Sequence, residues 1–498
     1  MKLPRTGGLL LHPTSLPGPY GIGDVGPLAH YFVDFLAAAG QRLWQVLPLG
    51  PTSYGDSPYQ CLSAFAGNPL LVSPDRLIED DLLPREALVG YPRFPADRVD
   101  YEQVIPAKER LLRKAFAHFE ANAPGPQRDR FERFRRALVH QSWLPDYVLF
   151  AALKAHHGGK CWADWARELR DRKPAAIAEA RSALAPEIRF QEFAQFCFHR
   201  QWADLRAHAA QNDIRLVGDA PIFVAYDSAD VWAHRDLFKL DPEGRPLAVA
   251  GVPPDYFSET GQLWGNPLYD WKRHEETGYA WWTERVRVLL SSVDLVRLDH
   301  FRGFESYWAV PAAEETAING TWEPGPGRAL FAALEDALGS LPIIAEDLGV
   351  ITPPVEELRD GCGFPGMKVL QFAFGTGAKN AFLPHNHVRD SVVYSGTHDN
   401  DTTVGWYGGL PQADRDQIAA YLGRPVEDPA WALIHLAMGS VANAAIVPMQ
   451  DVLSASSTAR MNLPGAASGN WAWRFQNECL TEQLAARLAG LAKTFGRA

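Results

Sequence analysis

Residues 293–303 read VDLVRLDHFRG. The first half is apolar and rich in β-branched residues, which is typical of a buried strand. The second half is polar and mostly charged, with Arg297, Asp299, His300 and Arg302. In α/β barrels the carboxyl ends of the strands carry the chemistry, so the stretch predicts a strand that ends in a functional site.

Seven further apolar runs have the same character, and helical patterns separate them, such as the amphipathic segment at about 26–39. The seven runs lie at 8–16, 42–50, 214–223, 341–349, 366–374, 391–399 and 444–452. Strands that alternate with helices pair in parallel and are covered on both faces. Eight such units favour a closed barrel.

We therefore predict an α/β fold, a (β/α)8 TIM barrel with large helical and loop insertions after strands 2 and 3 and no separate C-terminal β domain. Residues 1–498 would form this single barrel, with a mostly helical insertion at 51–212 and a second insertion at 224–290. The alternative is a doubly wound open sheet. It would need a glycine-rich first turn, and GPYGIG at 18–23 lacks the GxGxxG spacing.

Composition excludes several classes of protein. The 498 residues are 47% hydrophobic, which is enough for a large core. The net charge of −11 argues against a nucleic-acid binder. Five scattered cysteines without a CxxC pair indicate reduced thiols rather than disulfides or zinc. Neither a signal segment nor a bilayer-spanning run is found, so we expect a cytoplasmic protein without a membrane partner.

Four of the predicted strands end in acidic residues. These are Asp219, Asp299, the pair Glu346 and Asp347, and Asp399 after His398. A single Asp after a strand is usually a helix cap or a turn residue. Four strands that all end this way indicate carboxylates gathered around one barrel mouth.

Two chemistries could use such a set. One is metal binding, for which residues 398–401 (HDND) offer nitrogen and oxygen ligands. Adjacent residues rarely all face one ion, however, and there is no HxH or HExxH spacing. The other is glycoside cleavage, which needs a carboxylate nucleophile and a protonated carboxylic acid.

The second chemistry fits the local sequence. Arg297 lies two residues before Asp299, so both side chains point the same way from a strand. A cation there favours an ionised nucleophile. Glu346 follows the apolar run LPIIA, where burial favours the protonated form that a general acid requires.

Long motifs then point to a family. They are HPTSLPGPYGIGD, SYGDSPYQCLSAFAGNP, GDAPIFVAYDSADVW, GVPPDYFSETGQLWGNPLYDW, VRLDHFRG, AEDLGVIT, GFPGMKVLQFAF, YSGTHDNDTT and ARMNLPG. With these motifs the chain resembles, over essentially its whole length, the 4-α-glucanotransferases of the amylomaltase (disproportionating enzyme) family, in the α-amylase clan.

The resemblance implies the catalytic roles. Asp299 would be the nucleophile that carries a covalent glycosyl-enzyme, and Glu346 the general acid/base. Asp399 would be the third carboxylate, which grips sugar hydroxyls and favours a distorted ring. Arg297 would orient Asp299. The resemblance implies no redox or nucleotide cofactor and no required metal.

It also implies the substrate contacts. His300 and His398 would bind hydroxyls of the cleaved glucose with support from Asp219, while Asp347 would point away. The expected substrates are maltooligosaccharides and α-1,4-glucans. Further candidates, partly from the aromatic-rich Gly/Pro loop at 251–267 that makes the second insertion a substrate-binding one, are Ser57, Tyr59, Tyr256, Phe257, Gln262, Trp264 and Asn462.

The leading hypothesis is therefore transfer of an α-1,4-glucan segment to another glucan or to glucose. We expect Tyr59, Tyr256, Phe257 and Trp264 to stack on acceptor sugars and to limit the access of water. One alternative is an α-glucan hydrolase of the same clan. The other is a barrel that binds glycans without chemistry, although simple binding does not need an Arg-oriented Asp facing a buried Glu.

Overall fold

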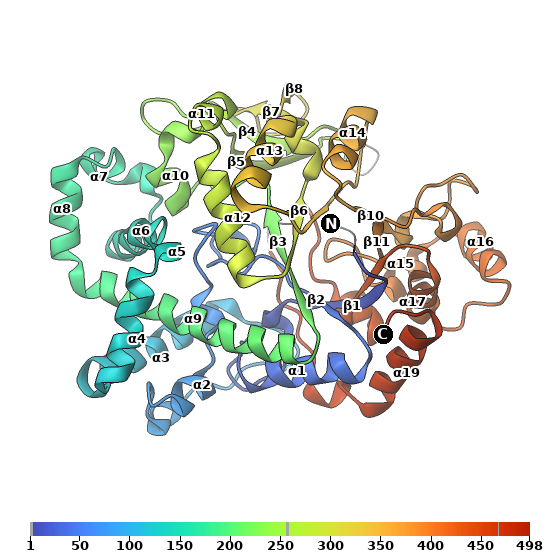
Figure 1. The fold of residues 1–498 in the computed structure, drawn as a ribbon, viewed down its shortest axis with the longest axis horizontal. Coiled ribbons are helices and arrows are strands. Elements are labelled where there is room, and N and C mark those ends of the chain that lie inside the picture. Colours follow the sequence, from blue (N-terminus) through green and yellow to red (C-terminus); the bar gives the residue numbers. More distant parts are fainter. Residues whose placement is uncertain (1–2, 255–257, 467) are drawn as a thin grey trace.

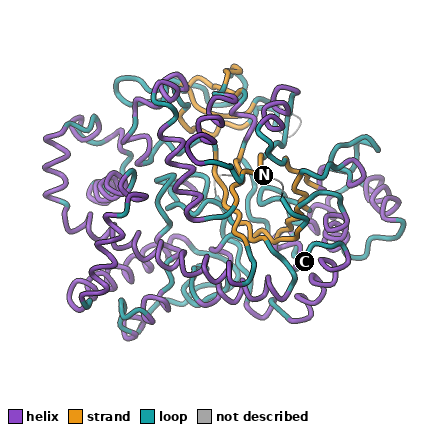
Figure 2. The backbone as a smooth tube through the Cα atoms, in the orientation of Figure 1, coloured by secondary structure: helices purple, strands orange, loops and turns teal. Residues whose placement is uncertain are grey.

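Eight parallel strands form the centre of the computed structural model, which describes residues 3–254, 258–466 and 468–498. Their order in the sheet is β10-β11-β12-β1-β2-β3-β6-β9. A backbone hydrogen bond from Ala345 N to Pro365 O (2.9 Å) joins the two end strands, so the sheet nearly closes into a barrel (Figure 2). The strands are β1 (Thr6–Leu10), β2 (Leu43–Gln45), β3 (Arg215–Pro221), β6 (Leu295–Asp299), β9 (Ile343–Ala345), β10 (Gly366–Val369), β11 (Ser391–Tyr394) and β12 (Ala444–Pro448).

Alternate residues of the barrel strands pack in two separate cores. One core fills the barrel interior, and its members include Leu10, Leu43, Val217, Leu295 and Ile344. Their neighbours in sequence point outward into a second core against the helices, among them Leu9, Trp44, Leu216, Val296 and Ile343. This alternation is the two-residue period of a strand buried on both faces.

Helices cover the outside of the barrel (Figure 1). Those between or after the barrel strands are α1 (Pro27–Ala38), α10 (Ala229–Ala233), α11 (Trp271–Glu276), α12 (Ala280–Ser292), α13 (Gly327–Leu338), α14 (Pro353–Gly361), α15 (Thr403–Gly409), α16 (Gln412–Leu422), α17 (Pro429–Gly439), α18 (Met449–Val452) and α19 (Glu482–Thr494). After β12 the described residues form helices, turns and loops but no further strand.

A long helical segment separates β2 from β3. Its helices are α2 (Pro74–Glu79), α3 (Tyr101–Asn122), α4 (Gly125–Arg136), α5 (Leu138–Gln141), α6 (Leu144–His156), α7 (Arg167–Arg170), α8 (Pro174–Ala183) and α9 (Ala185–Gln211). Helix α3 has one buried face, which includes the side chain of Lys108. The Lys108 ammonium donates to Val72 O (2.7 Å) and lies 3.5 Å from Asp24, so this buried charge is compensated.

A second, antiparallel sheet has the order β5-β4-β7-β8 and lies beyond the carboxyl ends of β3 and β6 (Figure 1). Its strands are β4 (Ala248–Val252), β5 (Gln262–Pro267), β7 (Ser306–Pro311) and β8 (Thr321–Pro324). The prediction that 251–267 is entirely a loop is therefore wrong, because its two ends belong to β4 and β5. Strands β7 and β8 also show an insertion after the fourth barrel strand that the sequence analysis did not predict.

The predicted barrel is confirmed in its eight strands and in its insertions after strands 2 and 3. The strands are shorter than the apolar runs, because each run continues past the strand into a loop, a 3-10 turn or, after β12, helix α18. All five cysteines are unpaired. Within the described chain, no helix has the length and apolar character needed to cross a membrane.

A buried arginine near the C-terminus lies at the amino-terminal end of the barrel, opposite the mouth at which the strands end. Arg497 has no exposed surface. Its guanidinium donates to Met438 O (2.7 Å), Thr6 O (3.0 Å) and Ser440 O (2.9 Å), among other carbonyls. These carbonyls belong to the start of β1 and to the end of α17, where the last carbonyls of a helix lack partners within it. One side chain thus ties the chain end to the first strand.

We predict that Arg497→Met lowers the free energy of unfolding by about 3 kcal/mol or more, because several buried carbonyls lose a charged donor. Urea denaturation followed by circular dichroism measures the loss. Arg487, which stacks on Trp431 (3.6 Å) from the exposed side of α19, is the matched control. Arg487→Met should cost about 1 kcal/mol or less. Equal losses in the two variants would contradict the role given to Arg497.

Candidate active site

A buried arginine holds two carboxylates at the barrel mouth. Asp219 on β3 and Arg297 on β6 are paired residues in adjacent strands, so their side chains point the same way into the barrel. Arg297 Nη1 lies 2.7 Å from Asp219 Oδ2, and Nη2 lies 2.8 Å from Asp299 Oδ1. Burial disfavours the charge of Arg297, but the two carboxylates outweigh it and hold its pKa well above the usual value. The guanidinium is therefore a fixed positive charge.

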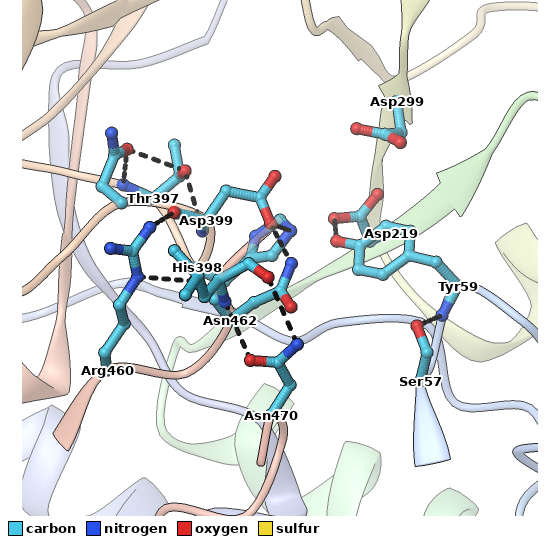
Figure 3. A network of polar contacts seen from close by, with 12 residues as sticks. Ser57, Tyr59, Asp219, Asp299, Thr397, His398, Asp399, Arg460, Asn462 and Asn470 are labelled. Atoms are coloured by element: carbon cyan, nitrogen blue, oxygen red, sulfur yellow. Dashed lines mark hydrogen bonds and ion pairs between the residues drawn. The ribbon is translucent and has the colours of Figure 1, made fainter. Parts of the chain in front are cut away.

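The two carboxylates differ in their exposure. The side chain of Asp219 is fully buried, and burial raises its pKa to about 6 against the opposing charge of Arg297. The side chain of Asp299 keeps 27% of its surface exposed. Figure 3 shows Asp299 above Asp219 and Tyr59. Asp299 is thus the carboxylate that a ligand in the mouth can reach.

Glu346 lies directly after β9 and is held by two backbone donors. His300 N donates to Oε2 (2.7 Å), and Leu348 N donates to Oε1 (2.9 Å). The side chain is buried, and burial together with the charge of Asp299 raises its pKa to about 8 despite Arg297. Because His300 follows Asp299 in the chain, its peptide N–H connects the two acidic residues directly. The arrangement sets a protonated carboxyl beside a carboxylate.

His300 adopts an uncommon backbone conformation at this point. Its φ is 52°, in the left-handed region, and the chain then enters the short 3-10 turn Phe301–Phe304. The imidazole meets Trp264 edge to face at 4.7 Å. Burial lowers the pKa of His300 to about 3, so the ring is neutral. Strained residues of this kind are concentrated at functional sites.

The loop after β11 forms the side of the barrel mouth that faces Asp219 and Asp299 (Figure 3). Asp399 Oδ1 accepts from Asn462 Nδ2 (2.7 Å) and lies 3.3 Å from His398 Nε2. Arg460 Nη2 donates to the backbone oxygen of Asp399 (2.7 Å). The side chain of Asp399 remains 46% exposed. Residues of the loop after β12 therefore fix Asp399 while leaving it open to the mouth.

Tyr59 contacts residues on both sides of the mouth. Its hydroxyl donates to Asp219 Oδ2 (2.9 Å), and its ring stacks on His398 at 5.0 Å with an interplanar angle of 14°. Burial and the charge of Asp219 raise the pKa of Tyr59 well above the usual value, so the hydroxyl stays a donor. Ser57 Oγ accepts from Tyr59 N (3.2 Å) and so supports the turn that carries the ring.

The remaining predicted residues lie as follows. Gln262 and Trp264 share one face of β5, and Trp264 Nε1 donates to Gln262 Oε1 (3.2 Å). Tyr256 and Phe257 lie outside the described residues. Asp347 accepts from Met367 N (2.6 Å) and pairs with Arg359, so its carboxylate contacts β10 and α14 rather than the other acids. Within residues 398–401, Asn400 and Asp401 turn away from His398 and Asp399, since Asn400 accepts from Thr397 N (2.8 Å) and Asp401 from Ser457 Oγ (2.7 Å).

One carboxylate of this region was not predicted from the sequence. Asp451 follows β12 and is 1% exposed. It accepts from Ser395 Oγ (2.6 Å), Thr403 N (2.7 Å) and Thr403 Oγ1 (2.7 Å), which lie on either side of the loop that carries His398 and Asp399. The rule that located the other acids, an apolar run that ends in a carboxylate, also fits the eighth run. Asp451 thus holds together the two ends of the loop that carries Asp399.

Similar proteins decide the family. The family model described as 4-alpha-glucanotransferase matches residues 11–481. A 4-alpha-glucanotransferase of Thermus thermophilus is 52% identical over 505 residues, with 100% of each chain covered. One of Synechocystis sp. is 51% identical over 497 residues, covering 99% of this chain and 98% of its own. The chain belongs to the 4-alpha-glucanotransferase family.

Solved structures agree with this assignment. The amylomaltase of Streptococcus agalactiae, solved with acarbose, has a TM-score of 0.96 at 38% identity and covers 99% of this chain and 100% of its own. The amylomaltase of Corynebacterium glutamicum, at 18% identity, shares the fold with a TM-score of 0.78, covering 98% and 75%. The resemblance drawn from the motifs is thereby confirmed, and the chain is a glycosyl-transferring enzyme.

We predict that Asp451→Ala lowers kcat about 10- to 100-fold, because the loop that carries Asp399 loses its anchor and a displacement of about 1 Å can cost this much. Glucan transfer assays measure the loss, and Asp451→Asn, which keeps one acceptor, should restore part of the activity. Asp428 is the matched control. It accepts from Trp431 N (3.2 Å) and Ser454 Oγ (2.9 Å) but caps α17 instead. A similar loss of kcat in Asp428→Ala would refute the specific role of Asp451.

Proposed function

We propose that the enzyme transfers α-1,4-glucan segments between maltooligosaccharides or longer glucans by a retaining double displacement. The nucleophile is Asp299, and the general acid/base is Glu346. The observation that carries the proposal is the pairing of a carboxylate held by Arg297 with a buried carboxyl whose pKa is raised to about 8. Retaining glycosidases need this combination of groups in one cleft.

The first step forms a covalent intermediate. An oxygen of Asp299 attacks the anomeric carbon of the donor while the glycosidic bond breaks. Glu346 gives its proton to the departing oxygen, so the leaving chain acquires a free 4-hydroxyl and Glu346 becomes a carboxylate. Arg297, on the other Asp299 oxygen, keeps the nucleophile oriented during the attack.

The second step reverses the roles of the two groups. The ester at Asp299 carries no charge, so the repulsion that helped to raise the pKa of Glu346 disappears. Glu346 is then a suitable base. It removes the proton from the 4-hydroxyl of an acceptor glucan, whose oxygen attacks the anomeric carbon and releases Asp299. Two inversions at that carbon give net retention.

The surrounding groups suit a neutral, hydroxyl-rich ligand. Asp399, with Oδ1 held by Asn462, keeps its exposed side for sugar hydroxyls. Neutral His300 and the His398 imidazole offer further hydrogen bonds to the sugar. Asp219 supports the subsite of the cleaved glucose by holding the Tyr59 hydroxyl. The rings of Tyr59 and Trp264 provide apolar surface for acceptor sugars. Tyr256 and Phe257 stay predictions for the same role, as does the cytoplasmic location that the unpaired cysteines favour.

Incubation with maltotriose tests the function. A ladder of longer products is expected. Glucose and maltose alone would indicate hydrolysis, and unchanged maltotriose would indicate a protein that only binds glycans. Chromatography separates the three outcomes.

We predict that Asp299→Ala abolishes transfer while the fold stays intact, because Arg297 keeps its buried ion pair with Asp219. The stronger test uses Glu346→Gln with an α-glycosyl fluoride as the donor, because the fluoride leaves without needing a proton from a general acid. A covalent adduct should accumulate, and mass spectrometry of the digested protein should place it on Asp299. An adduct on a different residue would disprove the assignment.

We also predict that donor cleavage from maltotriose slows as the pH rises through about 8, because Glu346 then loses the proton that the leaving oxygen needs. Above that pH the single-turnover rate should fall about tenfold per unit. A fluoride donor should lose this dependence in the same enzyme. If both donors show the same alkaline limb, a group other than Glu346 causes it.

A further inference from the structure

The two faces of the antiparallel sheet differ in their surroundings. One face carries Trp264 and Tyr307, which pack on Phe223, and Trp264 also contacts His300. Trp308 and Trp322 are paired residues on the opposite face, which we name the Trp322 face. Their rings meet edge to face at 5.2 Å. The Trp322 face has no role in the site described above.

The Trp322 face and the segments that precede β8 and follow β9 expose apolar side chains. Trp322 is 42% exposed, although tryptophan is usually among the most buried residues. Leu263 on β5, Ile318 before β8 and Val350 after β9 are also exposed, at 37%, 50% and 57%.

The ring of Trp322 is held rigidly. The guanidinium of Arg302 stacks on it at 3.9 Å from the ring centre, and Arg302 itself is only 6% exposed. Trp308 packs against it and donates through Nε1 to Ala317 O (2.8 Å). With these contacts in place, 42% of Trp322 remains exposed. A fixed, partly exposed aromatic ring costs little entropy when it contacts a ligand.

The same contacts connect the ring to the catalytic residues. Arg302 follows His300 by two residues and Asp299 by three. Its Nη2 donates to Ser306 Oγ (3.3 Å), and its Nη1 donates to Val350 O, in the loop that begins with Glu346. The Trp322 ring therefore lies against the loop that carries the proposed nucleophile, and Arg302 links that loop to the loop of the proposed acid/base.

We infer that Trp322 is an outlying stacking platform for the α-1,4-glucan chain on the acceptor side of the cleft. The inference rests on the roles proposed for Asp299 and Glu346. Glu346 protonates the leaving chain and then deprotonates the acceptor, so both chains lie against Glu346 and its loop. A glucan that extends past that loop meets Val350 and then Trp322. The apolar face of a glucose ring suits the exposed part of the indole, and a neutral sugar is not repelled by Arg302.

The test compares a short acceptor with a long one. With α-maltosyl fluoride as the donor, transfer products are measured at increasing concentrations of glucose or of maltohexaose. In Trp322→Ala the ratio of KM for maltohexaose to KM for glucose should rise about 3- to 10-fold, as expected for the loss of one stacking contact. Trp322→Phe should restore most of the difference.

Tyr31 on α1 provides the matched control, since it is 43% exposed and lies away from the second sheet. Tyr31→Ala should leave the KM ratio unchanged. An unchanged ratio in Trp322→Ala overturns the inference, as does an equal rise of both KM values, or a rise in KM for the donor alone. If the wild-type enzyme makes no transfer product, the proposed function itself fails.

Discussion

The ion pairs of Arg297 are the constraint on which the active site depends. One buried guanidinium holds Asp219 on one side and Asp299 on the other, within a barrel whose interior below them is apolar. Taking a charge out of water costs several kcal/mol unless partners compensate it. The buried Asp219 could not be kept as a carboxylate here without the arginine, and the buried guanidinium could not be kept without a carboxylate partner. The pairs therefore also fix the geometry of Asp299.

Strand alternation explains why these residues meet. The inward positions of β6 are Leu295, Arg297 and Asp299. The same two-residue period therefore places leucine in the barrel interior and the charged pair at the barrel mouth. Val217 and Asp219 follow the same rule on β3, and Ile344 and Glu346 follow it at β9. The apolar residues build the scaffold, and the next inward residue along each strand carries the proposed chemistry. Barrel enzymes can change function at these positions without changing their core.

Much of the fold and site followed from local patterns. Eight apolar runs predicted the eight strands, and the residues at their ends included Asp219, Asp299, Glu346 and Asp399. The antiparallel sheet was not predicted, because β4 and β5 flank a stretch rich in Gly and Pro that reads as a loop, and β8 has only four residues. The bond from Asn462 to Asp399 and the stacking of Tyr59 on His398 join segments far apart in sequence. No local pattern encodes such contacts, so only the long family motifs suggested Asn462 and Tyr59.

The charges of the proposed mechanism balance at every stage. In the free enzyme Arg297 is positive, Asp219 and Asp299 are negative, and Glu346 is protonated, which gives the four groups a net charge of about −1. After the first step Asp299 is an ester and Glu346 is a carboxylate, and the net charge is again about −1. The proton leaves with the departing chain, while the negative charge moves from one side of the anomeric carbon to the other. A partly buried site can tolerate this exchange, because no net charge is created in it. The constant negative charge also favours the positive character that develops on the sugar between the two states.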